Sequence, residues 1–298
     1  MTISRIHFEA LSFLDREKKQ ENITQSAISQ MIGISLNTVK EALLFLSDNG
    51  LIKNNKLTQK AYKVLEPYRV KRAIFIAAGL GSRMVPITIN TPKPLVRIKG
   101  VRIIDTLLDA VYAAEINDVI IVRGYLKEQF DQLKYKYPNI KFVDNPLFNK
   151  ANNISSMMCT RYQLQNSYVI DSDLFLKNSS LISKYQYASN YLGIPADYTD
   201  DWCFETKDRI IKGIGVGGKN CHQWIGISYW NKTDGKKLAD HIKQVYEMPG
   251  GKELFWDQVP LEYFKKEYTV EVRECSFDDI IEIDTFNELK KIDETYNI

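Results

Sequence analysis

The strongest constraint on the fold is an alternation of short β-branched runs with longer amphipathic segments after residue 72. The runs AIFIAAG, DVIIVRGY, IKFVDN and SYVIDSD suit buried strands, and the segments IIDTLLDAVYAAEI and LKEQFDQLKYKY suit helices. Strands that alternate with helices form βαβ units, and such units build a largely parallel sheet covered by helices. The sequence therefore predicts an α/β fold with a mixed, mainly parallel sheet.

The pattern changes after SYVIDSD, where polar, aromatic-rich strands continue to about residue 230. Within this part, RIIKGIGVGGKNCHQWIGISYW predicts a hairpin that turns at residues 217–220. Two helices are expected to follow, over KKLADHIKQVYEM and DTFNELKKIDETY. Near the other end of the chain, LEPY breaks the pattern before a basic strand begins. We therefore predict two domains, 1–68 and 70–298.

Residues 23–52 have the spacing of a helix-turn-helix. Gly33 suits a left-handed position in the turn, and Ser35 can cap the second helix. Residues 49–58 can add a short two-stranded wing. The first domain resembles the winged-helix domains of bacterial transcription regulators, and this resemblance implies a DNA partner.

The charge of the chain gives only weak support for a nucleic-acid partner. The whole chain has 40 Lys+Arg against 37 Asp+Glu, a net charge of +3, and residues 1–68 hold 9 Lys+Arg against 7 Asp+Glu. Proteins that neutralise several phosphates usually carry more positive charge, and the expected recognition helix offers Lys40 beside Glu41. Two interpretations of residues 1–68 stay open: DNA binding, or packing that includes formation of a homodimer.

A glycine-rich loop, AAGLGSR at 77–83, follows the first strand of the larger domain, and TPKPL follows at 91–95. The loop is not a P-loop, and Met84 stands where a dinucleotide fingerprint needs glycine. Its small residues let backbone N–H groups approach a polyphosphate, and Arg83 and Lys93 add two cations. The loop therefore predicts a phosphate-binding site.

This AAGxGxR…PK element is similar to that of sugar-nucleotide and cytidylyl transferases. In nucleotidyl transfer an anionic phosphate attacks the α-phosphorus of a nucleoside triphosphate, so cations carry most of the catalysis. We expect Lys93 to contact the α-phosphate and the incoming phosphate. We expect Arg83 to hold the β- and γ-phosphates of the departing pyrophosphate.

Two carboxylates, Asp171 and Asp173, end the strand SYVIDSD on one face, where an open α/β sheet binds its ligand. Mg²⁺ usually takes one or two carboxylates together with substrate phosphates, so magnesium is the expected cofactor. The resemblance places one metal ligand on Asp173 and a second on Asp284, with Asp257 as the alternative. A structural interpretation of Asp284 also stays open, as the N-cap of the last helix.

Several stretches together narrow the family: AAGLGSRMVPITINTPKPLV, DVIIVRGYLKEQFDQLK, NNISS, SYVIDSD, LFWDQV and IIEIDT. Over residues 72–298 the chain resembles the bacterial CTP:phosphocholine cytidylyltransferases. The resemblance implies a Rossmann-like nucleotidyltransferase fold and transfer of CMP from CTP to phosphocholine, with release of pyrophosphate. It places the nucleotide against Ala78, Gly79, Gly81, Ser82, Gly124, Tyr125, Asn153 and Ser156.

A choline head group has no N–H to donate, so it is recognised by aromatic faces, each worth about 0.5–2 kcal/mol, and by a nearby carboxylate. The segment DYTDDW at 197–202 has both kinds of residue. The candidate substrate-binding residues are Asp197, Tyr198, Asp201, Trp202, Trp230 and Trp256. The acids also suit a primary amine, so 2-aminoethylphosphonate and phosphoethanolamine stay open as acceptors. The alternative to an enzyme is a winged-helix regulator that senses a nucleotide or a choline metabolite.

The sequence predicts neither export nor membrane insertion. No apolar run reaches the roughly 20 residues that span a bilayer, and acids and bases interrupt MTISRIHFEALSFLDREKK, unlike a signal peptide. The four cysteines are far apart and form no CxxC pair, so we expect reduced thiols. The expected location is the cytoplasm, without a membrane partner.

Overall fold

The computed structural model describes residues 3–18 and 23–297, and the chain divides into two compact units. The smaller unit is formed by Met1–Arg69 together with Lys184–Tyr187. The larger unit is formed by Val70–Ser183 and Ala188–Ile298. The sequence boundary left 184–187 in the larger domain, whereas in the structure this segment belongs to the smaller unit.

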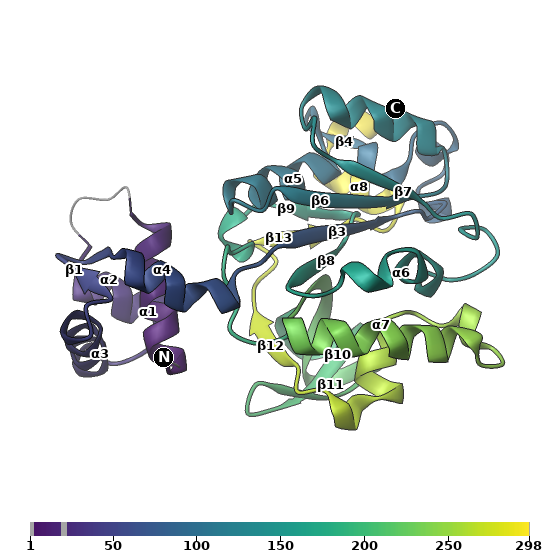
Figure 1. Cartoon of the computed structure of the whole chain (residues 1–298). Helices are drawn as coiled ribbons and strands as arrows, with labels where there is room; N and C mark the ends of the chain where they lie inside the picture. Colours follow the sequence, from purple (N-terminus) through teal and green to yellow (C-terminus); the bar gives the residue numbers. More distant parts are fainter. Residues whose placement is uncertain (1–2, 19–22, 298) are drawn as a thin grey trace. The chain divides into compact units, whose positions relative to one another are not determined.

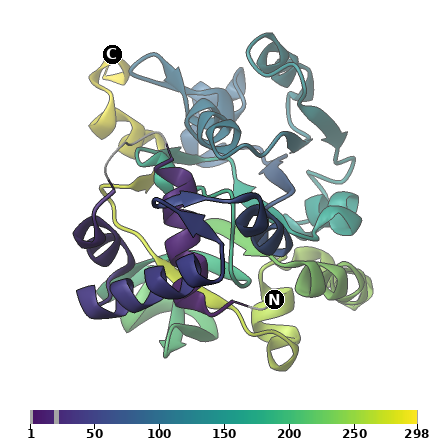
Figure 2. The same cartoon turned by 60° about the vertical axis from the view of Figure 1, so that its left-hand side comes forward.

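The smaller unit consists of short helices and one small hairpin, coloured purple to blue in Figure 2. The α2–α3 turn contains Gly33, whose φ of 72° is a left-handed value, and the Ser35 hydroxyl caps α3 by accepting from Thr38 N at 3.2 Å. Asn54 and Asn55 turn the hairpin with φ values of 51° and 57°. The elements are α1 (Arg5–Arg16), α2 (Gln25–Ile32), α3 (Leu36–Asp48), β1 (Ile52–Lys53), β2 (Lys56–Leu57) and α4 (Gln59–Leu65).

The segment 184–187 completes the core of this unit. The Tyr185 side chain is buried in the apolar cluster of the unit, and Lys184 Nζ lies 3.3 Å from the buried carboxylate of Asp15. The ring of Tyr187 stacks on that of Tyr68, with centroids 5.4 Å apart. The four residues Lys-Tyr-Gln-Tyr stand in a loop and have no periodic pattern that would indicate such a distant partner, so sequence patterning alone misses it.

The larger unit contains a seven-stranded sheet in the order β10-β12-β11-β8-β3-β6-β7. The central strands β8, β3, β6 and β7 are mutually parallel, whereas β11 pairs with β8 in the antiparallel sense. This arrangement confirms the predicted α/β fold with a mixed, mainly parallel sheet. The strands are β3 (Arg72–Ala77), β6 (Asp118–Arg123), β7 (Lys141–Asp144), β8 (Ser167–Asp171), β10 (Asn190–Lys207), β11 (Ile210–Trp230) and β12 (Glu271–Glu274).

Helices cover both faces of this sheet (Figure 1). Successive strand residues point to opposite faces, and accordingly Phe75 packs in the cluster that includes the α5 residue Leu107, while Ile74 packs with the α7 residue Leu238. The covering helices are α5 (Ile103–Ala113) on one face, and α6 (Ile154–Thr160) and α7 (Lys232–Glu247) on the other.

Smaller elements surround this core. The expected helix over LKEQFDQLKYKY is a 3₁₀ helix, η5, over Lys127–Tyr135. The strand pair β9 and β13 carries residues of the site described below. The remaining strands and α-helix are β4 (Arg97–Ile98), β5 (Val101–Arg102), β9 (Leu174–Leu176), β13 (Ile280–Glu282) and α8 (Phe286–Ile292).

The predicted hairpin turn at 217–220 is wrong. Residues 210–230 form one long strand, β11, and the turn lies before it at Asp208 and Arg209, with φ values of 51° and 65°. The glycine-rich part of β11 stays paired with β10, but the register shifts repeatedly, as between Thr199 and Trp202. Glycine in a strand interior permits such bends and bulges, so here these residues bend a strand and do not end it.

Two further features concern the cysteines and the length of the helices. All four cysteines are free thiols, and Cys203, Cys221 and Cys275 are buried. Across residues 3–18 and 23–297, no helix combines the length and the apolar character that a bilayer crossing requires.

Candidate active site

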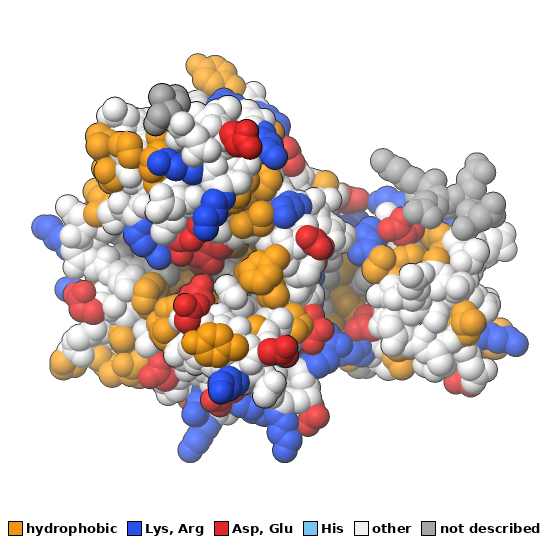
Figure 3. Space-filling model, turned by 180° about the vertical axis from the view of Figure 1, so that it is seen from behind, with side chains coloured by type: hydrophobic (Ala, Val, Ile, Leu, Met, Phe, Trp, Pro, Cys, Tyr) orange, Lys and Arg blue, Asp and Glu red, His pale blue; other side chains and the backbone are white. Residues whose placement is uncertain are grey.

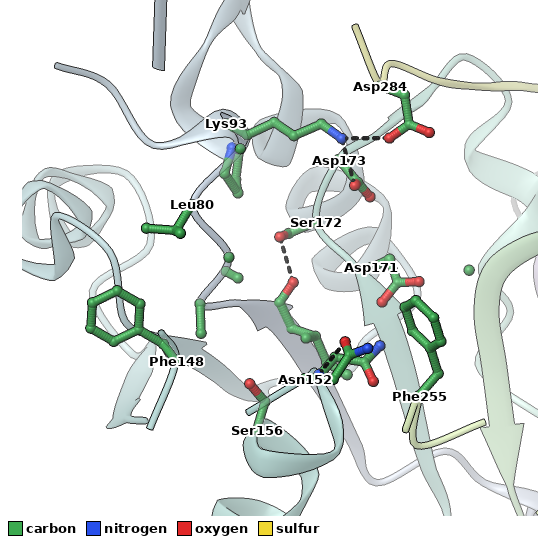
Figure 4. Close-up of a pocket in the computed structure, with 18 of the residues that line it drawn as sticks. Leu80, Lys93, Phe148, Asn152, Ser156, Asp171, Ser172, Asp173, Phe255 and Asp284 are labelled. Carbon is green, nitrogen blue, oxygen red and sulfur yellow. Dashed lines mark hydrogen bonds and ion pairs between the residues drawn. The ribbon is translucent and has the colours of Figure 1, made fainter. Parts of the chain in front are cut away.

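A cavity of about 620 Å³ opens at the carboxyl ends of β3 and β8, where an open α/β sheet places its ligands. Its wall comes from the glycine-rich loop, the start of α6, the end of β8, β11 and two C-terminal segments. On the face seen in Figure 3, acidic side chains of the larger unit gather in a hollow beside cationic and hydrophobic ones. The close-up in Figure 4 shows Leu80 and Phe148 at one end, and Asp171 and Phe255 at the other.

The glycine-rich loop folds back on the segment that carries Lys93. Gly81 has a φ of 64°, and a Cβ there would lie 3.0 Å from Thr88 Cγ2 and 3.2 Å from Lys93 Cβ. The Thr88 hydroxyl donates to Gly81 O at 2.8 Å and holds the fold-back in place. At Gly79, by contrast, a Cβ would meet no atom within 4 Å. The missing side chain at Gly79 therefore leaves open space in the cavity wall.

Lys93 lies at the centre of the site, and only 8% of its surface is exposed. Its Nζ donates to Asp173 Oδ2 at 2.8 Å and to Asp284 Oδ1 at 2.9 Å (Figure 4). Burial alone would lower the pKa of Lys93, but the two carboxylates outweigh it and raise that pKa above its ordinary value. Lys93 is therefore a fixed cation at neutral pH. Arg83, also predicted, is largely exposed and donates to Asp284 Oδ1 at 2.8 Å.

Three carboxylates meet beside Lys93: Asp173, Glu282 and Asp284, with ligand oxygens within 4.8 Å of one another. They come together because β13, which ends at Glu282, pairs with β9, which directly follows Asp173. Asp173 Oδ1 is buried and has no hydrogen-bond partner among the described residues. Burial, with the charges of Asp173 and Asp284, raises the pKa of Glu282 to about 8. Such a cluster of hard oxygen donors is suited to a divalent cation.

The structural interpretation of Asp284 as a helix N-cap is wrong. The N-cap of α8 is Thr285, whose hydroxyl accepts from Glu288 N, and the Glu288 carboxylate closes a capping box. The same carboxylate accepts from Asp284 N at 2.7 Å. The start of α8 therefore fixes the backbone of Asp284 and leaves its carboxylate facing Lys93.

Asp171 and Asp257 also line the cavity, at the end that holds Phe255, and Asp171 interacts with both Asp173 and Asp257. A Cβ on Gly226 would lie 2.1 Å from Asp171 Oδ2, so glycine on β11 makes room for this carboxylate. Tyr191 donates its hydroxyl to Asp257 Oδ1 at 2.7 Å, while Asp257 Oδ2 is buried and unpartnered among the described residues. Burial raises the pKa of Asp257 to about 7, and burial together with Asp173 and Asp257 raises that of Asp171 well above its ordinary value.

Aromatic side chains stand next to these acids. Trp202, Trp224 and Phe255 all line the cavity. The ring of Trp202 meets that of Trp224 edge to face at 5.8 Å and that of Phe255 at 5.7 Å. Asp201, the neighbour of Trp202, also lines the cavity and is exposed. This end therefore combines aromatic surface with negative charge.

The structure places four of the predicted substrate-binding residues outside the cavity wall. Trp230 and Trp256 are 0% and 2% exposed, and they pack in the core with α7, so neither ring can face a ligand. Asp197 and Tyr198 are exposed on β10 outside the cavity wall. Trp230 ends β11 and Trp256 lies in a loop, and both pack in the core with α7. Local sequence patterning does not reveal which of these residues become core.

The predicted nucleotide-binding residues divide into two groups. Gly124 and Tyr125 lie outside the wall: a Cβ on Gly124 would be 2.5 Å from Phe148 Cβ, and Tyr125 N donates to Ala78 O at 3.2 Å. They support the wall from behind, since Gly124 lets Phe148 approach the cavity. The predicted residues that do line the cavity are Ala78, Gly79, Gly81, Ser82, Asn153 and Ser156.

Sequence reasoning missed several residues of the wall. Glu282 stands two residues before Asp284 in IIEIDT, and the strand period of two would have placed both on one face. Phe255 belongs to the stretch LFWDQV but was not among the predicted site residues. Asn145, Phe148 and Trp224 carried no motif, because strand pairing and loop packing bring them to the cavity. Their identification required the tertiary structure.

The raised pKa of Asp257 predicts a pH-dependent stability. Its pKa rises from an ordinary 3.8 to about 7 on burial, so between these values the folded state binds more protons than the unfolded state. Stability contributed by protonated Asp257 is therefore lost as pH rises through this window. Asp171, close by, and Tyr191, bonded to Asp257, face the same carboxyl group.

We expect Asp257→Asn to remove the fall in folding stability that the titration of Asp257 causes as pH rises. Melting temperatures of the variant and the wild type, measured from pH 4 to 8, should diverge in favour of the variant as pH rises to about 7. Parallel curves would show that Asp257 is not the titrating group.

Comparison with known proteins supplies an independent line of evidence. Residues 72–179 match the family described as nucleotidyl transferase. The chain is 34% identical to a 2-aminoethylphosphonate cytidylyltransferase of Lancefieldella rimae, over 75% of this chain and 92% of that protein. It is also 34% identical to a choline-phosphate cytidylyltransferase of Streptococcus pneumoniae, over 75% of this chain and 97% of that protein.

A solved structure agrees with these sequence similarities. The structure of a CTP:phosphocholine cytidylyltransferase from Streptococcus pneumoniae superposes with a TM-score of 0.70 at 35% identity. It covers 76% of this chain and 99% of that protein. The similarity therefore spans the whole of that structure.

Proposed function

This chain belongs to the nucleotidyl transferase family, among the cytidylyltransferases, and on that premise we propose that it transfers CMP from CTP to phosphocholine, giving CDP-choline and pyrophosphate. The observation that carries the proposal is the position of Lys93. Its buried ammonium lies between a glycine-rich loop with open space and a cluster of carboxylates, next to an aromatic and acidic subsite. One cavity thus holds the groups needed for a triphosphate and for a cationic acceptor.

The transfer step requires two anions to approach each other. A phosphate oxygen of the acceptor attacks the α-phosphorus in line, the bond to the bridging oxygen breaks, and pyrophosphate leaves with the electron pair. Lys93 would neutralise charge on the α-phosphate and the incoming phosphate, where preorganised cations contribute most. Arg83, exposed at the mouth of the loop, would hold the pyrophosphate. No nucleophilic side chain is needed.

Magnesium is the cofactor that we propose for the carboxylate cluster. Asp173 and Asp284 would hold it, with Glu282 as a third candidate ligand. The unpartnered Asp173 Oδ1 and the oxygen donor set support this fit. Bound there, the ion would offset the charge that develops on the phosphate oxygens. Lys93 and Arg83, which bond the same carboxylates, would keep them oriented.

The aromatic and acidic end would bind the head group of the acceptor. A quaternary ammonium is attracted to aromatic faces, and Trp202, Trp224 and Phe255 provide them beside Asp171 and Asp257. A second acceptor, 2-aminoethylphosphonate, is favoured by one specific observation: Asp257 Oδ2 is buried without a donor, and a primary ammonium could donate to it. Phosphoethanolamine offers the same ammonium group. A quaternary ammonium would therefore depend on the aromatic faces of this end, whereas a primary ammonium would depend on the hydrogen-bond acceptor Asp257.

Trp202→Ala separates these alternatives. With phosphocholine as the main acceptor, the variant should raise the KM for phosphocholine about tenfold, because a desolvated cation–π contact is worth about 0.5–2 kcal/mol. The KM for CTP should stay near the wild-type value. Trp202→Phe, which keeps an aromatic face, is the matched control. A wild-type preference for 2-aminoethylphosphonate, with little effect of Trp202→Ala, would overturn phosphocholine in favour of the primary amine.

We also propose that the smaller unit is a winged-helix domain that binds DNA. The favouring observation is the hairpin tip, where Lys53 and Lys56 flank the turn, are exposed and form no ion pair within the described residues. The test measures the dissociation constant of the full chain for a 20-base-pair DNA duplex at several salt concentrations. Lys53→Ala/Lys56→Ala should flatten the logarithmic salt dependence by about two phosphate equivalents.

No binding at low salt would overturn the DNA proposal. Packing would then be the role of this unit, and the exposed apolar residues Leu36 and Leu44 on α3 would suit a homodimer contact. Sedimentation equilibrium of the full chain would test that role. A chain that stays monomeric at high concentration would contradict it.

A further inference from the structure

Two asparagines at the start of α6 bind a segment about a hundred residues further along the chain. Asn152 N donates to Lys252 O at 2.8 Å, and Asn152 Nδ2 donates to Glu253 O at 3.0 Å. Asn153 Oδ1 accepts from Trp256 N at 2.9 Å. These three bonds join α6 to residues 252–256, the segment that carries Phe255 and leads directly to Asp257.

The start of α6 is also fixed to the nucleotide end of the cavity, which is the part lined by predicted nucleotide-binding residues such as Gly79 and Ser156. Asn145, which follows β7, donates through Nδ2 to Ser155 Oγ at 2.9 Å and to Ser156 Oγ at 3.0 Å. All three side chains are buried. The first turn of α6 is therefore held by Asn145 on one side and tied to the 252–256 segment on the other.

The two polar atoms of the Asn153 side chain have different surroundings. Its Oδ1 is taken by Trp256 N, whereas its Nδ2 forms no hydrogen bond with any residue that the structure describes. The residue itself lines the cavity. Trp256 is buried in the core and fixes the far end of the bond, so a change at Asn153 would be transmitted to Phe255 and Asp257, on either side of it.

We propose that Asn153, assisted by Asn152, is a positioning residue that ties the acceptor end of the site to the nucleotide end. This inference rests on the proposed cytidylyl transfer and adds to it a determinant of acceptor affinity. Asn153 holds the backbone of Trp256, and through it places Phe255 and Asp257 against the acceptor head group. The Asn152 bonds to Lys252 O and Glu253 O hold the preceding part of the same segment.

The kinetic test compares Asn153→Ala with Asn153→Asp. Aspartate keeps the oxygen that accepts from Trp256 N and loses the Nδ2 donor, whereas alanine loses both. We expect Asn153→Ala to raise the KM for the acceptor about fivefold to tenfold, and Asn153→Asp to restore it to near the wild-type value. Asn153→Asp should still raise the KM for CTP, because it adds a negative charge to the nucleotide end. Equal acceptor KM values in both variants and the wild type would overturn the proposal.

A second readout does not depend on turnover. Amide hydrogen exchange of the full chain without substrates should show faster exchange at Trp256 in Asn153→Ala, and wild-type exchange in Asn153→Asp. Asn49→Ala, which removes a similar side-chain bond to Phe45 O in the smaller unit, is the control and should leave Trp256 unchanged. Unaltered exchange in Asn153→Ala would overturn the positioning role. Absence of wild-type transfer activity would instead overturn the proposed function, and the exchange result would still decide whether Asn153 holds the segment.

Discussion

Lys93→Ala is expected to lower kcat for pyrophosphate release by about 10²–10³-fold, the usual cost of losing one preorganised electrostatic group. Lys93 is the buried cation of the site, and its pKa is raised by Asp173 and Asp284, so it carries its charge throughout the neutral range. No other lysine lines the cavity in the part of the chain that the structure describes. Steady-state kinetics with CTP, Mg²⁺ and phosphocholine would measure the loss.

Two controls make this result specific. Alanine at position 93 leaves Asp173 and Asp284 without their shared cation, so the melting temperature must be measured to show that the variant is folded. Arg83→Ala should cost less, because Arg83 is 67% exposed and solvent screens its charge. Near wild-type turnover in folded Lys93→Ala would contradict the assigned role.

Asp173→Asn should have the second large effect. Loss of one carboxylate from the cluster should lower kcat at least about 100-fold and raise the Mg²⁺ concentration needed for half-maximal rate, since a bound metal supplies several kcal/mol of transition-state stabilisation. Without metal, the variant should stay folded, because the lost charge attraction to Lys93 is offset by the loss of repulsion from Glu282 and Asp284. Mg²⁺ titrations of activity and of melting temperature would test both expectations.

Asp257→Asn is the matched control for the metal prediction. Asp257 lies in the same cavity but is not one of the three clustered carboxylates. Its asparagine variant should keep the wild-type Mg²⁺ dependence while the acceptor KM changes. If Asp284→Asn kept the wild-type Mg²⁺ response and Asp257→Asn lost it, Asp257 would be the second metal ligand, which is the alternative to Asp284 that the sequence analysis left open.

The central fold could be predicted because its elements have strong local signals. Buried strands such as 72–77 and 167–171 are short apolar runs, and the helix at 103–113 has apolar spacing on one face. The turn between β10 and β11 was misplaced, because glycines at 213–218 look like turn residues and instead bend a paired strand. Local patterning cannot distinguish a bend from a turn when the partner strand is unknown.

The site residues that could be predicted are likewise those with a local signal in the sequence, whereas the missed residues depend on distant partners. Arg83, Lys93, Asp173 and Asp284 belong to short motifs whose chemistry is visible in the sequence, and the structure brings them together. The membership of the cytidylyltransferase family confirms the resemblance on which those motifs were interpreted.

The residues that line the acceptor end could not be predicted from short motifs. All three residues are tryptophans, but α7 packs over Trp230 and Trp256 and buries them, whereas Trp224 lines the cavity. Which tryptophan faces the cavity is decided by sheet twist, strand register and helix packing. These properties involve partners that are distant in sequence, so composition and spacing do not reveal them.

The most direct test of the account is ³¹P NMR of the full chain with CTP and Mg²⁺, and with phosphocholine, phosphoethanolamine or 2-aminoethylphosphonate in parallel samples. The account predicts the diphosphate resonances of CDP-choline together with pyrophosphate, fastest with phosphocholine and absent when Mg²⁺ is removed by a chelator. Faster product formation with an acceptor that carries a primary amine would support CMP transfer and replace phosphocholine as the acceptor. Unchanged CTP with all three acceptors would contradict the central claim.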